Sequence, residues 1–448
     1  MSSMSMTALE ATKQKRTHVR WIVCGLMWAA IAINFIDRTT LAIATPHIMQ
    51  DLSITTEEMG MVMSAFFLCY ALLQIPAGFV SEKFGQRKAL GMSVLWWSIA
   101  TALTGLATGF KSILGMRMIL GVGEAGAYPS NAAITRKWFP KSERATVGGI
   151  FDSGQKFGGA FGIPILTWLM IQIGWRGTFA ILGVLGIIWA IVWFAFFKDD
   201  PAKNKHVNAA ELAYIKSGQD TDETSNKAMP CKWYELLKFR NMQAMCIGFF
   251  ATNYSSYFFI TWLPMYLMKD RGLSFAQMGF AASLPLLCGA IVEVIAGWSS
   301  DKIVSSGKFS LTKTRKMFLC GGLILASTIG FAAVTESIYV TLFLLCCAKS
   351  GTVIAASQTW AIPSEIAPRN MTGIVAGIQN CVANFGGVVG PIVTGFIVGA
   401  TGHFEFAMLF TALLLLGAVL NYIFYLGKIE PMKVEEKTVV STLMCKLL

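Results

Sequence analysis

The chain has 448 residues, of which 54% are hydrophobic and only 14% are charged, and its formal net charge is +12. Soluble domains carry roughly a quarter charged residues, so this composition excludes an ordinary soluble protein. It indicates a chain whose solvent is largely lipid. Whether the basic charge points to nucleic acid depends on where the lysines and arginines lie.

Apolar stretches recur along the chain at about the 20 residues that an α-helix needs to cross a bilayer. Several contain Gly, Ser and Pro, which membrane helices tolerate. We therefore expect an all-α membrane protein with twelve transmembrane helices, at residues 21–44, 60–80, 89–108, 112–134, 146–171, 176–197, 242–267, 275–300, 317–335, 338–362, 372–399 and 404–427.

Basic residues are distributed unevenly between the two sets of loops that these helices create. With a cytoplasmic N-terminus, the outward loops hold only Lys111, Arg176, Lys269 and Arg271. Positive charge collects on the cytoplasmic side of membrane proteins, so both termini are expected there. The positive charge is therefore a signal of orientation, and no nucleic-acid partner is expected.

The ten cysteines are scattered without a Cys-x-x-Cys spacing, and the four histidines fall outside the expected helices. Neither a disulfide framework nor a metal site is predicted, and no cofactor is expected. The first apolar stretch lacks a small-residue cleavage site, which favours an uncleaved first helix over a signal peptide.

One long polar stretch, from Asp199 to Arg240, divides the expected helices six and six. This division predicts a cytoplasmic N-terminal tail at 1–20, a six-helix bundle at 21–198 and a cytoplasmic linker at 199–240. A second six-helix bundle is expected at 241–427, followed by a cytoplasmic tail at 428–448.

The two halves also repeat each other. Phe157-Gly158-Gly159 precedes Pro164 in the fifth expected helix, and Phe385-Gly386-Gly387 precedes Pro391 in the eleventh. Two six-helix repeats with the same orientation predict a substrate site near the membrane midplane between the halves. The alternative is that glycines merely allow close helix packing, which explains the glycines but not their shared register.

The segment Gly78–Lys88 resembles the loop signature of the major facilitator superfamily, with Glu82 where that pattern usually has aspartate. Asn34–Ala42 resembles the anion:cation symporter branch, as do Gln74–Gly78 and Gly121–Ala125. The resemblance covers nearly the whole chain and extends to bacterial carriers of sugar acids such as galactonate, glucarate, galactarate and hexuronates. It implies two parallel-repeat six-helix bundles.

Eight charged residues fall within the expected helices and away from their ends. An ionisable residue at membrane depth is costly, and it is therefore a candidate functional residue. Their signs balance, which indicates internal pairing: the acids are Asp37, Glu124, Asp152 and Glu293, and the bases are Arg38, Arg117, Lys156 and Lys349.

Three of these residues are predicted to couple transport to protons. Asp37 and Arg117 lie at similar depths, about 10 Å below the outer surface, and Glu124 lies two helical turns beyond Arg117. Stepwise proton movement is one interpretation, and a permanent salt-bridge lattice is the other. Buried ion pairs stabilise proteins weakly, which favours the functional interpretation.

Arg38 is the candidate anchor for a substrate carboxylate, because its guanidinium is always charged and offers a forked pair of donors. In the family that the chain resembles, the matching residues are associated with proton coupling and anion binding, which assigns those roles to Asp37, Arg38, Arg117 and Glu124. The resemblance also places neutral cavity-lining residues at Tyr70, Gln155, Ser357, Trp360 and Asn380.

Lys156 lies outside the family pattern. It is one turn from Asp152, whose carboxylate could neutralise it, and it adjoins Gln155, where it could bind a second substrate carboxylate. The i, i+4 spacing favours the Asp152 pair. Glu293 is either a further titrating site or the partner of Lys349.

The function that these features predict is proton-coupled import of a hexonate, hexarate or hexuronate by alternating access. A carrier of another small organic anion, working as a uniporter or an efflux pump, is the alternative. The chain is expected to be no enzyme and to lie as a monomer in the inner (plasma) membrane. Its expected partners are the organic anion, protons and the lipid bilayer.

Overall fold

The structure, a computed structural model, describes residues 15–140, 142–217, 233–368 and 371–432. The secondary structure of these residues is helical, with no β-strand among them, which confirms the all-α class. Parts of the expected N-terminal tail (1–14), linker (218–232) and C-terminal tail (433–448) lie outside the described residues.

The described residues of the first half form seven helices. Their bounds are α2 (Val19–Leu52), α3 (Thr56–Phe84), α4 (Gln86–Thr104), α5 (Phe110–Glu124), α6 (Ala127–Trp138), α7 (Arg144–Ala160) and α8 (Gly162–Phe196). A capping box starts α3, where the side chain of Thr55 accepts from the Glu58 N–H and the Glu58 side chain accepts from the Thr55 N–H. Gly174 interrupts α8 with φ 72°, a left-handed value that glycine adopts readily.

A short connection and the second half follow. They comprise η1 (Pro201–Lys203), α9 (Ala209–Ser217), η3 (Trp233–Lys238), α10 (Arg240–Thr261), α11 (Leu263–Lys269), α12 (Phe275–Ser305), α13 (Leu311–Ala326), α14 (Ile329–Val334), α15 (Ile338–Ile366), α16 (Thr372–Thr401), α17 (Glu405–Leu420) and the π-helical η4 (Asn421–Tyr425).

Eight helical stretches in the described part of the chain are long and apolar enough to cross a membrane. Every expected transmembrane segment overlaps helical residues. However, the eight stretches do not include α4, the pair of short helices α5 and α6, α7 or α10. These helices are too short, or contain too many polar residues, to be identified as membrane-spanning from length and hydropathy. The number of twelve crossings therefore stays a prediction.

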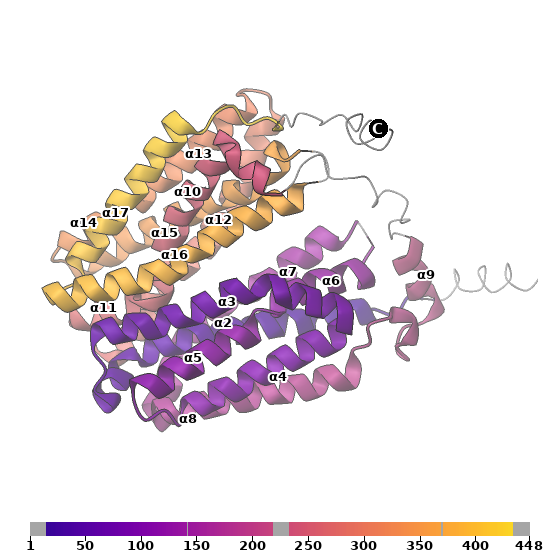
Figure 1. The fold of residues 1–448 in the computed structure, drawn as a ribbon, viewed down its shortest axis with the longest axis horizontal. Coiled ribbons are helices and arrows are strands. Elements are labelled where there is room, and N and C mark those ends of the chain that lie inside the picture. Colours follow the sequence, from indigo (N-terminus) through magenta and orange to yellow (C-terminus); the bar gives the residue numbers. More distant parts are fainter. Residues whose placement is uncertain (1–14, 141, 218–232, 369–370, 433–448) are drawn as a thin grey trace, which may run out of the picture.

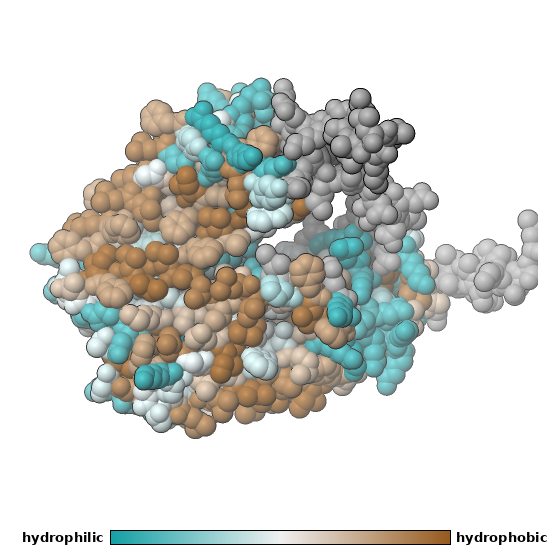
Figure 2. Space-filling model, viewed as in Figure 1, coloured by the Kyte–Doolittle hydropathy of each residue, from teal (hydrophilic) through white to brown (hydrophobic). Residues whose placement is uncertain are grey.

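Figure 1 shows α2 to α8 as one bundle and α10 to α17 as a second bundle beside it. Within the bundles α7 packs on α2 and α16 on α10, while α3 packs on α16 and α8 on α12 between them. We call the end where α2 begins and η4 finishes the terminal end, and the other the far end. Figure 2 shows a largely hydrophobic exterior, hollowed between the bundles toward the end where α9 lies.

The repeated glycines explain part of this packing. A Cβ on Gly158 of α7 would lie 2.8 Å from the Ala32 carbonyl oxygen of α2, and one on Gly386 of α16 would lie 2.8 Å from the Tyr254 nitrogen of α10. Only glycine permits such approaches. The two glycines thus occupy equivalent places, each packing the fifth expected helix of its half against the first.

A further glycine brings the two bundles together at the far end. A Cβ on Gly60 of α3 would lie 2.6 Å from the carbonyl oxygen of Pro391 on α16. Near them the Ser64 hydroxyl donates to the Val388 carbonyl oxygen at 2.7 Å. The bundles are therefore in close contact toward the far end.

Candidate functional site

An ion pair between α2 and α5 forms the centre of the candidate site. Arg38 Nε lies 2.7 Å from Glu124 Oε2, and the exposed fractions of the two residues are 7% and 0%. The guanidinium carbon of Arg38 lies 4.4 Å from the ring centroid of Tyr70 and 4.9 Å from that of Phe66. Arginine thus has both a carboxylate partner and aromatic faces, an arrangement that holds a guanidinium in place in a dry site.

Asp37 and Arg117 lie in the same buried region without a direct hydrogen bond. Asp37 interacts electrostatically with both Glu124 and Arg117. Among the described residues, neither carboxylate oxygen of Asp37 has a hydrogen-bond partner, and neither do Nε and Nη1 of Arg117. The guanidinium of Arg117 instead lies 4.9 Å from the Phe66 ring centroid. The similar depths of Asp37 and Arg117 bring them into electrostatic range but not into contact.

Unpaired polar atoms are concentrated here. Besides those of Asp37 and Arg117, Nη2 of Arg38, Oε1 of Glu124 and both amide atoms of Asn34 are buried with no hydrogen bond of standard geometry among the described residues, although the Asn34 side chain interacts with Glu124. Buried polar atoms are paired in the great majority of cases, so each exception requires an explanation. A cluster of them fits a site that exchanges protons, water or a bound anion.

Tyrosines connect this region to other predicted residues. The Tyr128 hydroxyl lies 3.1 Å from Gln155 Oε1 and 3.2 Å from Asp152 Oδ1. The Tyr257 hydroxyl, from the second bundle, donates to Asn384 Oδ1 at 2.9 Å. Both tyrosines interact electrostatically with Tyr70 and Arg38.

Sequence reasoning did not identify Tyr128, Tyr257 or Asn384. Membrane tyrosines commonly belong to interfacial belts, which hides a functional tyrosine among them. The one available signal was the spacing of Tyr128, four residues after Glu124.

A second charged group joins the bundles. Lys156 Nζ on α7 lies 3.2 Å from Glu293 Oε2 on α12 and 3.8 Å from Asp152 Oδ2 on its own helix. Lys349 on α15 interacts electrostatically with Glu293 and Lys156, and its Nζ lies 5.6 Å from the Phe259 ring centroid. The expected Asp152 contact is therefore present, but the nearer carboxylate comes from the other bundle.

The predicted residues of the second bundle lie on two helices, Ser357 and Trp360 on α15 and Asn380 on α16. Ser357 Oγ accepts from Gln358 Nε2 at 2.8 Å, and Trp360, 55% exposed, packs edge-on against Phe249 at a centroid distance of 5.7 Å. Both contacts are within the second bundle. Asn380 is half-buried on α16, one turn from Asn384.

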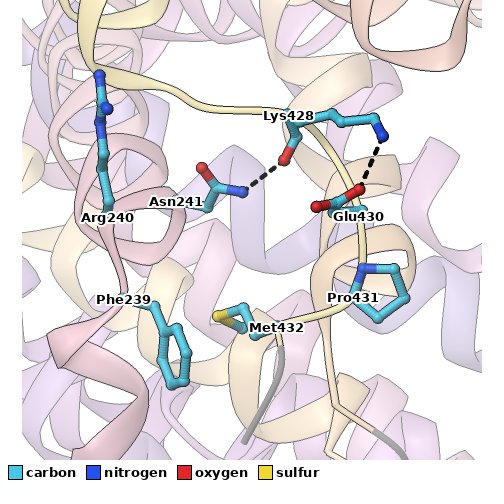
Figure 3. A pocket seen from close by; sticks show the side chains of 7 residues that line it. All are labelled: Phe239, Arg240, Asn241, Lys428, Glu430, Pro431 and Met432. Atoms are coloured by element: carbon cyan, nitrogen blue, oxygen red, sulfur yellow. Dashed lines mark hydrogen bonds and ion pairs between the residues drawn. The ribbon is translucent and has the colours of Figure 1, made fainter.

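A surface pocket also lies at the terminal end of the second bundle (Figure 3). In it, the Asn241 amide nitrogen donates to the Lys428 carbonyl oxygen at 2.7 Å, and Lys428 pairs with Glu430 at 3.0 Å. Its lining is Phe239, Arg240, Asn241, Lys428, Glu430, Pro431 and Met432, which includes no predicted site residue. The buried charges on α2 and α5 remain the candidate site.

Known proteins resemble this chain in both sequence and fold. The family model of the Major Facilitator Superfamily matches residues 27–391 and again 245–442. The chain is 34% identical to the probable galactarate/D-glucarate transporter GudP of Bacillus subtilis, over 93% of this chain and 94% of that protein. It is 33% identical to the D-galactonate transporter of Escherichia coli O6:H1, over 92% of this chain and 96% of that protein.

A solved structure of a bacterial homologue of the human lysosomal transporter Spinster, in its inward-facing and unoccupied conformation, superposes with a TM-score of 0.77. The match covers 91% of this chain and 97% of that one at 18% identity, which establishes the shared fold. On this evidence the chain belongs to the Major Facilitator Superfamily and is a multi-pass membrane transporter.

Proposed function

We propose that the protein is a proton-coupled symporter that imports a sugar acid, a hexonate, hexarate or hexuronate, by alternating access. The substrate class follows from the relatives, which are named as carriers of galactarate, D-glucarate and D-galactonate. The observation that carries the mechanism is the bond of Arg38 to Glu124, which leaves Arg38 Nη2 without a partner among the described residues.

Arg38 supports anion binding because Nε is bonded to Glu124 while Nη2 makes no hydrogen bond of standard geometry among the described residues. A planar carboxylate is bound best by two parallel N–H donors. Nε is held by Glu124, so a substrate carboxylate and Glu124 compete for the same guanidinium. Protonation of Glu124 weakens its hold on Nε and releases the whole fork to the substrate.

Asp37 and Arg117 extend this competition along α2 and α5. A proton on Asp37 or Glu124 changes which carboxylate Arg117 balances, because both acids interact with it electrostatically. Gln155 and Tyr70 supply neutral groups for substrate hydroxyls, and Ser357, Trp360 and Asn380 are proposed to line the second-bundle side. In this scheme the positive charges of Arg38 and Arg117 are balanced by Asp37 and Glu124. Binding of a proton to either acid therefore changes how much positive charge is available to the substrate anion.

Alternating access requires the two bundles to move about the central site. We propose the bundles to be residues 21–198 and 241–427, which rock as units. The close contact of Gly60 with Pro391 closes the far end, and the hollow toward α9 opens the terminal end (Figure 2). The terminal end carries the basic loops, so we assign it to the cytoplasm of a plasma membrane.

Uptake into proteoliposomes tests this function. The full chain, reconstituted with an acidic outside, is expected to accumulate radiolabelled galactonate or glucarate above its external concentration. A protonophore should abolish accumulation while leaving equilibrative entry. Accumulation that is indifferent to the pH gradient, or the absence of sugar-acid entry, would contradict the proposal.

A further inference from the structure

Four charged side chains, Asp152, Lys156, Glu293 and Lys349, form what we call the inter-bundle charge cluster. They come from α7 of the first bundle and from α12 and α15 of the second. The proposed mechanism does not use them. Exposed fractions of 31% for the Lys156 side chain and 29% for the Glu293 side chain show that this contact between the bundles is partly accessible.

The two lysines differ in how they are balanced. Lys156 has two carboxylates within 4 Å, Glu293 at 3.2 Å and Asp152 at 3.8 Å. Lys349 has no ion-pair partner among the described residues, and its aliphatic stem packs where a Cβ on Gly289 would meet it at 3.0 Å. An ammonium without a direct carboxylate partner inside a membrane protein is costly unless an anion visits it.

The depth of the cluster suits a ligand that also reaches Arg38. A Cβ on Gly158 would touch the backbone of Ala32 and Ile36, which fixes the register of α7 against α2. Lys156 therefore lies level with about residue 33 of α2, five residues from Arg38, or about 8 Å along the axis. The two helices run in the same direction, so the Cα–Cβ bonds of Arg38 and Lys156 both tilt toward the N-terminus and this offset is kept.

We infer that Lys156 and Lys349 form a subsite for the second carboxylate of a six-carbon dicarboxylate whose first carboxylate is held by Arg38. Five extended carbon–carbon bonds separate the two carboxyl carbons by about 6 Å, which is of the same order as the axial offset of about 8 Å between Lys156 and Arg38. The inference rests on the proposed function and narrows its substrate class to diacids.

Glu293 then acts as an internal substitute for that carboxylate. Without the diacid, Glu293 Oε2 pairs with the Lys156 ammonium from the opposite bundle. The second carboxylate replaces it there, binds Lys349 as well, and leaves Glu293 to turn toward the hollow between the bundles. A diacid thus connects α7 with α15, whereas a monoacid leaves the Lys156–Glu293 bond in place.

Binding of glucarate and galactonate to purified full-length variants by calorimetry tests the subsite. Lys156→Gln and Lys349→Gln should each weaken glucarate binding about tenfold or more, the usual cost of a lost charge-assisted bond. Galactonate binding should stay within about twofold of wild type. Glu293→Gln should leave glucarate binding unchanged or tighter, because it removes the competitor of the second carboxylate.

The opposite signs of the Lys156 and Glu293 variants distinguish a subsite from a structural ion pair. If the pair only holds the bundles together, both variants weaken glucarate and galactonate alike, and the inference fails. Lys156→Gln combined with Glu293→Gln removes the nearer of the two carboxylates that the single variant leaves without a partner, so it keeps the test valid if the single variant folds poorly. In the double variant glucarate should still lose affinity relative to galactonate.

Lys313→Gln, at a lysine outside the cluster near the start of α13, is the matched control and should bind both acids as wild type does. If the wild-type protein binds galactonate, and the Lys156 and Lys349 variants lose no more affinity for glucarate than for galactonate, this inference alone would be overturned. A wild-type protein that binds neither acid would overturn the proposed function with it.

Discussion

Arg38 and Glu124 lie 86 residues apart in the chain and are in direct contact, with Nε and Oε2 separated by 2.7 Å. The bond connects α2 to α5 inside the first bundle. Protonation of Glu124 leaves the buried guanidinium of Arg38 without its counter-charge, and a substrate carboxylate can restore the balance. The state of the bond therefore controls whether the guanidinium is available to a substrate anion.

Glu124→Gln tests that control. The amide imitates the protonated acid, so Arg38 stays available to substrate, and exchange of labelled for unlabelled galactonate should persist at a rate close to wild type. Accumulation driven by a pH gradient should be lost. The matched control, Glu405→Gln at the exposed start of α17, should retain both activities. Gradient-driven accumulation in the Glu124 variant at the wild-type level would remove Glu124 from coupling.

Arg38→Lys tests the anchor. Lysine keeps the charge but loses the fork and the planar face that lies over Tyr70, so galactonate affinity should fall about tenfold or more. Calorimetry on the purified variant measures this fall, with an unchanged gel-filtration profile showing that the protein is folded. Arg136→Lys, at an exposed position, should bind as wild type does. An unchanged affinity in the Arg38 variant would exclude Arg38 as the anchor.

Much of the fold could be predicted because a helix that crosses a membrane needs an apolar stretch of about 20 residues. Apolar stretches of spanning length predicted the all-α class, and the repeated glycines of Gly158 and Gly386 proved to make equivalent contacts in the two halves. The number of crossings remained a prediction. Helices such as α4 and α10 mix polar residues among the apolar ones, since buried membrane helices face protein as well as lipid.

The pairing of the charges was harder to predict, because it depends on helices far apart in sequence. The sequence identified Lys156 and Glu293, but only the i, i+4 neighbour Asp152 could be proposed with a geometric reason. Glu293 proved to lie nearer, from α12. Tyr257 and Asn384 were missed for the same reason, since nothing within α10 or α16 shows that their side chains meet beside Arg38.

Gly60→Ala should slow transport by opposing closure of the far end. The added methyl would lie 2.6 Å from the Pro391 carbonyl oxygen, which disfavours this arrangement of the bundles by about 1–3 kcal/mol. Exchange of labelled galactonate should slow about tenfold in consequence. Gly25→Ala, where nothing lies within 4 Å of the added carbon, is the control and should exchange normally. Equal rates in the two variants would show that Gly60 does not limit closure.

Glu211→Gln should destabilise the first bundle, because this carboxylate holds α9 against the start of α2. Its side chain is 0% exposed and accepts from Arg20 Nη1 at 2.9 Å, and it also accepts from the Thr17 hydroxyl at 2.6 Å. Breaking a buried pair costs about 3 kcal/mol or more, so the apparent melting temperature of the purified protein should fall. In the control Glu430→Gln, the lost pair with Lys428 has side chains that are 52% and 76% exposed, and the loss should be below about 1 kcal/mol. Thermal scans that give both variants the wild-type melting temperature would show that α9 is held by other contacts.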